Sequence, residues 1–163
     1  MLTRLQKLPK IIRKILLRDK VICKLLYHDS NNALEMEAPQ PALVQPYITT
    51  CPIYQFEGKD DYTQNGMINI YYAKIKRDEF EELSTNGILR INVVYNVDKW
   101  ELADEENRVL TIANRIINLL DKQQLETSGS LSFYSLDELI MSKTLVGYAL
   151  LFGINDGNSE ILN

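Results

Sequence analysis

Apolar and polar positions form their clearest pattern between residues 87 and 120 of the chain. From Leu89 to Val97, apolar side chains occupy every second position, which predicts a strand with one buried face. The spacing then changes to three and four residues, which predicts a helix with one apolar stripe. The residues of that stripe are Val109, Ile112, Ala113, Ile116, Ile117 and Leu120. Because each element must bury its apolar face, we expect this helix to pack on a sheet.

Three acidic residues, Asp104, Glu105 and Glu106, precede the apolar stripe of this helix. We expect them to lie in its first turn, where the helix dipole favours negative charge.

Similar apolar patterns predict further strands and a helical N-terminus. The predicted strands cover residues 48–56, 67–76, 131–134 and 144–154, and the helical segment covers residues 3–27. Long connections between the first three strands favour an antiparallel meander.

The helical segment contains two residues that set boundaries. Proline is well tolerated at a first helical position, so we expect the first helix to begin near Pro9. Asp19 suits the N-cap of a second, short helix that ends near Tyr27. The connection that follows contains Pro39, Pro41 and Pro46. These prolines predict an extended connection without a regular element.

Together the elements predict an α+β fold with a mainly antiparallel sheet of about five strands, packed against a central helix and joined by N-terminal helices. We divide the chain into four parts. They are a basic amphipathic helical arm (1–27), a proline-containing extended connection (28–47), an α+β core domain (48–155) and a C-terminal tail (156–163). The last strand has no polar face from 144 to 152, so we expect cover on both faces, from the N-terminal helices or from a neighbouring subunit.

Charge is distributed unevenly along the 163 residues. The formal net charge is −4, but residues 1–24 carry eight basic side chains and one acidic side chain, Asp19. That segment therefore has a charge of +7, which leaves −11 for the remainder. Such an asymmetry indicates that the two parts face different surroundings. A solvated helix face explains the basic residues equally well.

The chemistry-bearing residues do not form a recognisable site. Two cysteines provide no disulfide framework and favour a reducing compartment, and the single histidine, His28, argues against zinc. The paired carboxylates are better explained by solubility and by the helix dipole than by acid–base catalysis. No glycine-rich phosphate loop is present. We therefore expect no catalytic residue, no metal and no cofactor, and a protein that is not an enzyme.

The order of elements resembles a known group of proteins. Trp100 follows the third strand, the central helix reads Arg108-Val109-Leu110-Thr111-Ile112-Ala113-Asn114-Arg115-Ile116, and Gly147-Tyr148 lies in the last strand. This arrangement resembles the tail terminator and related neck (head–tail joining) proteins of tailed bacteriophages. The resemblance covers about residues 10–155 and depends on element order and weak local patterns.

The resemblance implies a structural virion protein that forms a ring, commonly a hexamer, on the end of the tail tube. Its implied partners are copies of itself, the tail tube protein and a neck or head-completion protein. Duplex DNA would pass through the ring without specific binding, and no membrane is involved. The implied location is the virion neck, and the host cytoplasm during assembly.

Two sets of charged residues are the candidate contact surfaces. The set expected at an interface with other copies or with a partner is Lys7, Lys10, Arg13, Lys14, Arg18, Trp100, Arg108 and Arg115. Arg108 and Arg115 could be donors of salt bridges between subunits or simply exposed. The acidic connections expected to face a partner or the ring lumen contain Glu57, Asp60, Asp61, Asp78, Glu79, Glu81 and Glu82.

A competing hypothesis assigns the basic segment to a different task. The chain would then be a nucleic-acid or membrane-surface binding module that uses the N-terminal arm. The N-terminus is also basic and amphipathic like a transit peptide, although it is poor in serine. If the arm is a docking element, a protein that lacks residues 1–18 is expected to stay folded.

Overall fold

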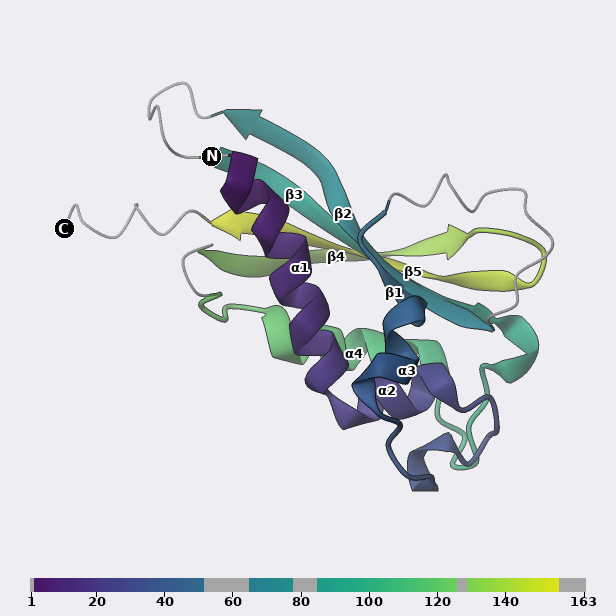
Figure 1. The fold of residues 1–163 in the computed structure, drawn as a ribbon. Helices are drawn as coiled ribbons and strands as arrows, with labels where there is room; N and C mark the ends of the chain where they lie inside the picture. The colour runs from purple at the N-terminus through teal and green to yellow at the C-terminus, as the bar shows by residue number, and fades with distance from the viewer. Residues whose placement is uncertain (1, 52–64, 78–84, 126–128, 156–163) are drawn as a thin grey trace.

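A computed structural model describes residues 2–51, 65–77, 85–125 and 129–155 of the chain. It has two layers, a five-stranded sheet and a layer of helices (Figure 1), which confirms the predicted α+β class. The helices are α1 (Leu2–Arg18), α2 (Lys20–Tyr27), α3 (Pro41–Val44) and α4 (Arg108–Leu120), with short 3-10 turns η1 (Ala33–Glu35), η2 (Gln45–Tyr47) and η4 (Val97–Lys99). The strands are β1 (Ile48–Thr49), β2 (Gly66–Arg77), β3 (Thr85–Asn96), β4 (Ser130–Ile140) and β5 (Leu145–Asn155).

The strands lie in the order β1-β2-β3-β5-β4. The β2–β3, β3–β5 and β4–β5 pairs are antiparallel, whereas β1 runs parallel to β2. The predicted meander is therefore wrong for its first strand. Residues 52–64 lie outside the described part of the chain, so the prediction of a strand over 48–56 is tested only at its start. β4 is longer than predicted because it pairs with β5 from Ser130 to Ile140, apart from a bulge at Tyr134.

The central strand and helix agree with the sequence pattern. Leu89, Ile91 and Val93 of β3 are fully buried, as are Ile112 and Ile116 of α4. α4 begins one turn later than the acidic residues suggest, because the side chain of Asn107 accepts a hydrogen bond from Leu110 N at 3.0 Å and caps the helix. The three predicted acidic residues precede this cap and do not lie in the first turn.

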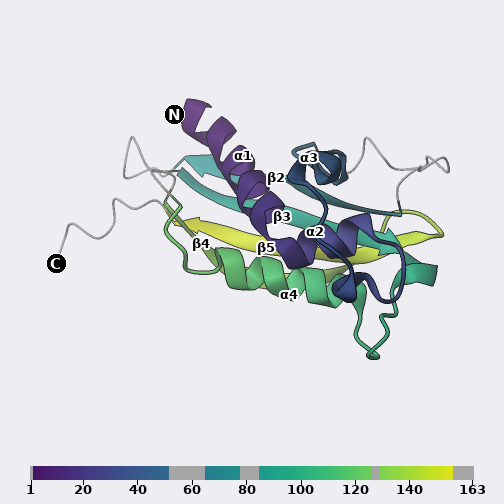
Figure 2. The ribbon, with the colours of Figure 1, turned by 60° about the horizontal axis from the view of Figure 1, so that its bottom comes forward.

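The N-terminal helices belong to the same hydrophobic core as the sheet. Leu8, Ile12 and Leu16 of α1 and Leu25 of α2 are buried in one cluster with β2, β3, β5 and α4. Figure 2 shows α1, α2 and α4 on the same side of the sheet. Residues 1–27 are therefore not a separate arm. The expectation that residues 1–18 could be removed without unfolding loses its basis, because removal would uncover this core.

Two expectations about proline are wrong. α1 begins at Leu2 and continues through Pro9, which is buried. The loss of one backbone hydrogen bond at Pro9 is offset by burial of the apolar side chains on both sides of it. The 28–47 segment is not simply extended, since Pro41 begins α3 and Pro46 lies in η2. Both prolines occupy early helical positions, where the missing N–H has no partner to lose.

The opposite face of the sheet has a different character. No helix of the described residues covers it, and on the helical side it is α4, rather than the N-terminal helices, that packs on β5. The expected cover of β5 by the N-terminal helices is therefore wrong. β5 presents Gly147, Ala149, Leu151 and Gly153 to the uncovered face, because β5 alternates and Leu150 and Phe152 face the helices. Gly147 is required there, since an added Cβ would lie 1.8 Å from the carbonyl oxygen of Val93.

The burial pattern of α4 generates a stability prediction. Truncation of Ile112 or Ile116 to alanine is expected to lower the free energy of unfolding by about 2–5 kcal/mol, because each leaves a cavity between helix and sheet. The matched substitutions Asn114→Ala and Asn118→Ala, on the exposed side, are expected to cost well under about 1 kcal/mol. Urea denaturation measures all four, and equal small effects would contradict the observed helix face.

Candidate partner-binding surface

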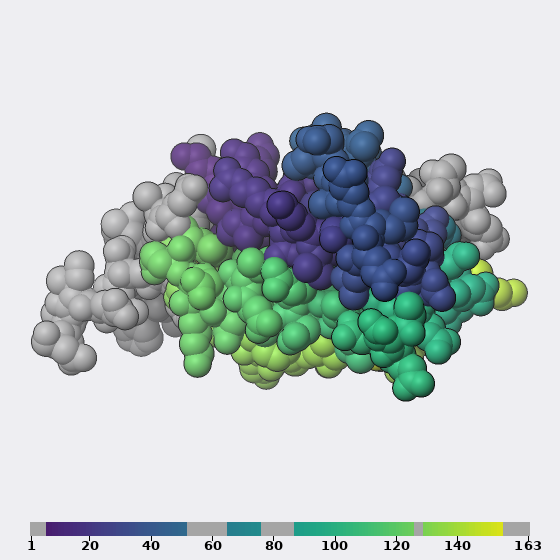
Figure 3. Space-filling view, turned by 90° about the horizontal axis from the view of Figure 1, so that it is seen from below, coloured from purple at the N-terminus to yellow at the C-terminus, as the bar shows by residue number. Residues whose placement is uncertain are grey.

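Four of the predicted interface residues gather on the outer face of α1. Lys7, Lys10, Lys14 and Arg18 are exposed. Together with Ile11, Ile15, Gln124 and Leu125 they line a groove of about 450 Å³ between α1 and the segment after α4. We call this the basic groove. Figure 3 shows the helical side of the molecule, where α1 lies beside the segment after α4.

The sequence places these cations together because of the helical repeat. Residues three or four apart share a face, and the opposite face is occupied by the buried Leu8, Ile12 and Leu16. Lys10, Lys14 and Arg18 follow one another at intervals of four, so each neighbouring pair repels. α1 contains no acidic residue to offset this repulsion.

Arg13 does not belong to the basic groove. Its side chain is half-buried, and Nη2 donates a hydrogen bond to the carbonyl oxygen of Gln45 at 2.7 Å. It therefore joins α1 to η2. The prediction of a partner contact for Arg13 is not supported by its position, which is fixed by this internal contact.

A second pocket of about 620 Å³ lies next to the groove, where Arg18 lines both. It is lined by Lys20, Cys23, Lys24 and residues 37–41. Cys23 is buried, and its Sγ donates to the carbonyl oxygen of Leu17 at 3.3 Å. Burial, with a contribution from the charge of Asp19, raises the pKa of this thiol to about 11. The thiol is therefore protonated at neutral pH and is a poor nucleophile.

Arg108 is not an interface residue, and that prediction is wrong. Its side chain is fully buried at the start of α4. Nε donates to Lys99 O at 2.8 Å, Nη1 donates to Leu25 O at 2.6 Å and His28 O at 2.7 Å, and Nη2 donates to Ser30 O at 2.7 Å. The guanidinium thus satisfies carbonyl groups at and beyond the end of α2, where a cation also complements the helix dipole.

The surroundings of Arg108 extend this network. Its guanidinium carbon lies 4.7 Å from the centre of the Tyr95 ring, a cation–π contact. The Tyr95 hydroxyl donates to Asp29 Oδ1 at 2.7 Å, and Asn65 Nδ2 donates to Asp29 Oδ2 at 2.6 Å. Burial lowers the pKa of Arg108, while Tyr95 and Asp29 oppose that shift. Burial and the hydrogen bond to Asp29 raise the pKa of Tyr95.

The other two predicted interface residues also have contacts within the chain. Arg115 forms an ion pair with Asp19, the residue whose side chain caps α2 by accepting from Ile22 N at 3.0 Å. Trp100 is half-buried, and its Nε1 donates to Tyr95 O at 3.0 Å. Both residues therefore fix the helices and the end of β3 in place. Arg115 remains partly exposed, at 42% of its side chain.

An exposed acidic turn was missed as a site by the sequence pattern. It contains Asp98, Glu101, Asp104, Glu105 and Glu106, all exposed, between β3 and α4. We call these five residues the acidic turn. Backbone bonds from Leu102 N to Glu106 O at 2.9 Å and from Ala103 N to Asn31 O at 2.9 Å hold it. The run Asp104-Glu105-Glu106 is visible in the sequence, where the helix dipole already accounts for it. The seven acidic residues predicted in the connections, from Glu57 to Glu82, lie outside the described residues.

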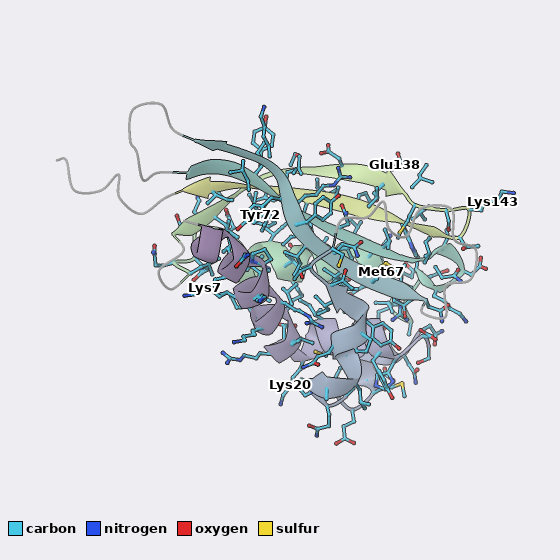
Figure 4. The ribbon with its side chains drawn as sticks, turned by 45° about the horizontal axis from the view of Figure 1, so that its top comes forward. Lys7, Lys20, Met67, Tyr72, Glu138 and Lys143 are labelled. Carbon is cyan, nitrogen blue, oxygen red and sulfur yellow. The ribbon has the colours of Figure 1, made fainter. Side chains whose placement is uncertain are left out.

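The outer edge of β4 forms another surface. Residues 121–124 bridge to the start of β4, at Leu131 and Ser130, and a bulge at Tyr134 separates that start from the remainder. Tyr134 and Ile140 are 77% and 68% exposed, more than any other large apolar side chain in the described part of the chain. Figure 4 shows Glu138 and Lys143 on this side of the molecule, away from Lys7 and Lys20.

Two further findings concern the described residues alone. They contain no group of three or more His, Cys, Asp or Glu side chains that could hold a metal ion. None of the helices is both long enough and apolar enough to cross a membrane.

The fold defines a small α+β protein, and its exposed charged and apolar patches are candidate contact surfaces. The chain belongs to the YomW family, whose sequence profile matches residues 19–154. The family name is that of a Bacillus phage-type gene product, which associates the chain with phages. No curated protein matches the chain. The match begins after α1, so the cations of the basic groove lie outside it.

The Arg108 network generates a stability prediction. Arg108→Met is expected to lower the free energy of unfolding by at least about 3 kcal/mol, because it leaves buried carbonyl groups without donors. Arg18→Met, the same substitution at an exposed position, is expected to change it by less than about 0.5 kcal/mol. Arg108→Lys is expected to recover only part of the loss, since an ammonium lacks the planar fork that reaches separate carbonyls. Urea denaturation that finds the two Met variants equal would contradict the network.

The raised pKa of Cys23 generates a labelling prediction. In the native protein, Ellman's reagent at pH 8 is expected to label Cys51, which is partly exposed, and to leave Cys23 unmodified. Unfolding in urea is expected to expose the Cys23 thiol to the reagent, so that both cysteines are labelled. The Cys51→Ser variant provides the control, and rapid labelling of that variant without urea would show that Cys23 is accessible and ionised.

Proposed function

We propose that the protein is a structural component of a phage neck, which assembles as a ring at the head–tail junction, ends the tail tube and connects it to the capsid neck. The resemblance to tail terminator and neck proteins supports this proposal, as does membership of a phage-associated family. In this proposal the protein carries out no reaction, and its surfaces bind the tail tube protein and a neck or head-completion protein. Its place of action is the virion, after assembly in the host cytoplasm.

The observation that carries the proposal is the outer part of β4. Tyr134 and Ile140 are six residues apart, so they are separated by about 20 Å along the strand. Exposed tyrosine and isoleucine side chains on one edge are typical of a protein contact surface, because their burial is favourable and costs little conformational entropy. The bulge at Tyr134 and the acidic pair Asp137 and Glu138 disfavour uncontrolled pairing of this edge with other strands. The edge therefore suits a side-chain contact with a specific partner.

The proposal predicts a defect in particle assembly. Phage particles assembled without the protein are expected to show tails of irregular length that are not joined to heads, as seen by electron microscopy. Normal tails of fixed length joined to heads would rule out the terminator role.

The contact surface is tested separately by substitution. The double variant Tyr134→Ser, Ile140→Ser is expected to fold but to support few joined particles, because truncation of central contact residues weakens binding by about 2 kcal/mol or more. Leu110→Ser, at an exposed position on α4, is the matched control and is expected to assemble normally. Equal assembly by both variants would show that the β4 edge is not the contact.

A further inference from the structure

We propose that the basic groove of one copy binds the acidic turn of a second copy, and that this contact builds the ring. The inference depends on the proposed function, since it names the contact between neighbouring subunits. It is carried by the groove itself, a hollow with a cationic rim and an apolar floor.

The groove is built to receive an anionic partner. Lys7, Lys10, Lys14 and Arg18 form its rim, and none of them makes an ion pair with an acidic residue of the described ranges. Ile11, Ile15 and the buried Leu125 supply apolar surface between α1 and the segment after α4. Closely spaced like charges destabilise a helix, so an anion in the groove would remove a repulsion that the free protein retains.

The acidic turn matches the groove in charge and in apolar content. Its five carboxylates are exposed and make no ion pair within the described part of the chain. Val97, immediately before it, is 47% exposed and is flanked by Asp98. An exposed apolar residue beside a run of carboxylates complements an apolar floor with a cationic rim, which is the usual arrangement of an interface with a polar rim. Charged rims of opposite sign also accelerate and orient association.

The positions of the two surfaces explain why the contact forms between copies. The acidic turn precedes Asn107, the N-cap of α4, and Gln124 and Leu125 follow Asp121, its C-cap. α4 has 13 residues and is therefore about 20 Å long, so the two surfaces lie at opposite ends of the helix (Figures 1 and 3). A contact between different surfaces of identical subunits repeats around an axis and can close into a ring.

A simpler explanation is that the charges complement the dipole of α4, with acids before its start and cations near its end. That explanation concerns stability within one chain and predicts no association. Glu105 separates the two explanations, because its backbone is in the left-handed region with φ of 60°, where glycine is favoured. Glu105→Gly is expected to leave the protein at least as stable in urea, and to weaken self-association.

Exchange of charge is the direct test. Self-association of the purified full-length chain is measured by light scattering over a range of concentrations. Two double variants are compared, one with Lys10→Glu and Lys14→Glu and the other with Glu105→Lys and Glu106→Lys. Each is expected to weaken self-association by at least about tenfold, because like charges then face each other. An equal mixture of the two double variants, and the single chain that carries all four substitutions, are expected to regain association. The control Lys74→Glu, Lys143→Glu makes the same change in net charge as Lys10→Glu, Lys14→Glu, at exposed positions outside the groove, and is expected to associate normally.

Three other outcomes would overturn the proposed contact between the basic groove and the acidic turn. Loss of association that neither the mixture nor the fourfold variant restores would overturn the pairing, as would a monomer at every concentration in low salt, where screening is weakest. Salt-sensitive binding of a short DNA duplex that disappears in Lys10→Glu, Lys14→Glu would assign the groove to nucleic acid. These outcomes leave the particle experiment unaffected, so a failure of the pairing is distinguishable from a failure of the neck role.

Discussion

The buried guanidinium of Arg108 determines how the helical layer is arranged. Its donors bind carbonyl oxygens of Leu25, His28, Ser30 and Lys99, which come from the end of α2, the turn after it and the end of η4. A buried cation is tolerated only when its donors are satisfied, so these segments can occupy only a narrow range of relative positions. α2 is thereby fixed against α4, and α1, which packs on both, is placed beside the segment that completes the basic groove. The acidic turn is held at the other end, since Arg108 binds Lys99 O and four of the five acidic residues lie between these two positions.

The regular part of the fold could be predicted because periodicity reports burial directly. β3 and α4 each have one apolar face, and the alternation and the three-to-four spacing remain visible in a single sequence. Arg108 could not be placed in this way. It borders the apolar stripe, where an arginine is ordinarily exposed. Three of its four carbonyl partners belong to residues 78 to 83 positions earlier in the chain. Every residue has a backbone carbonyl, so the sequence does not show which carbonyl groups need a donor. Only the folded structure shows that the Arg108 side chain is buried among them. Pro9 was misplaced for a related reason, because tertiary packing outweighed a local preference.

The candidate surfaces were predictable to different extents. Helical spacing alone brings Lys7, Lys10, Lys14 and Arg18 to one face, but it cannot show that Gln124 and Leu125 lie opposite and turn that face into a groove. Arg13 belongs to the same charge run yet contacts η2, which depends on the path of the proline-containing segment. The acidic turn required knowledge of where α4 begins. The sequence pattern places Asp104, Glu105 and Glu106 in the first turn of the helix, and the Asn107 cap excludes them from it.

The contact between Arg108 and Leu25 spans 83 positions of the sequence, and this separation has a consequence for biosynthesis. At translation rates of about 5–20 residues per second, the carbonyls at the end of α2 leave the ribosome roughly 4–17 s before the cation that binds them. During that interval the sheet is incomplete, because β3 ends only at Asn96 and β4 and β5 follow Arg108, so the apolar faces of α1 and α2 lack part of their cover. The N-terminal helices therefore lack several of their native contacts as they emerge. The nascent protein must complete most of its length before its first helices acquire a fixed place.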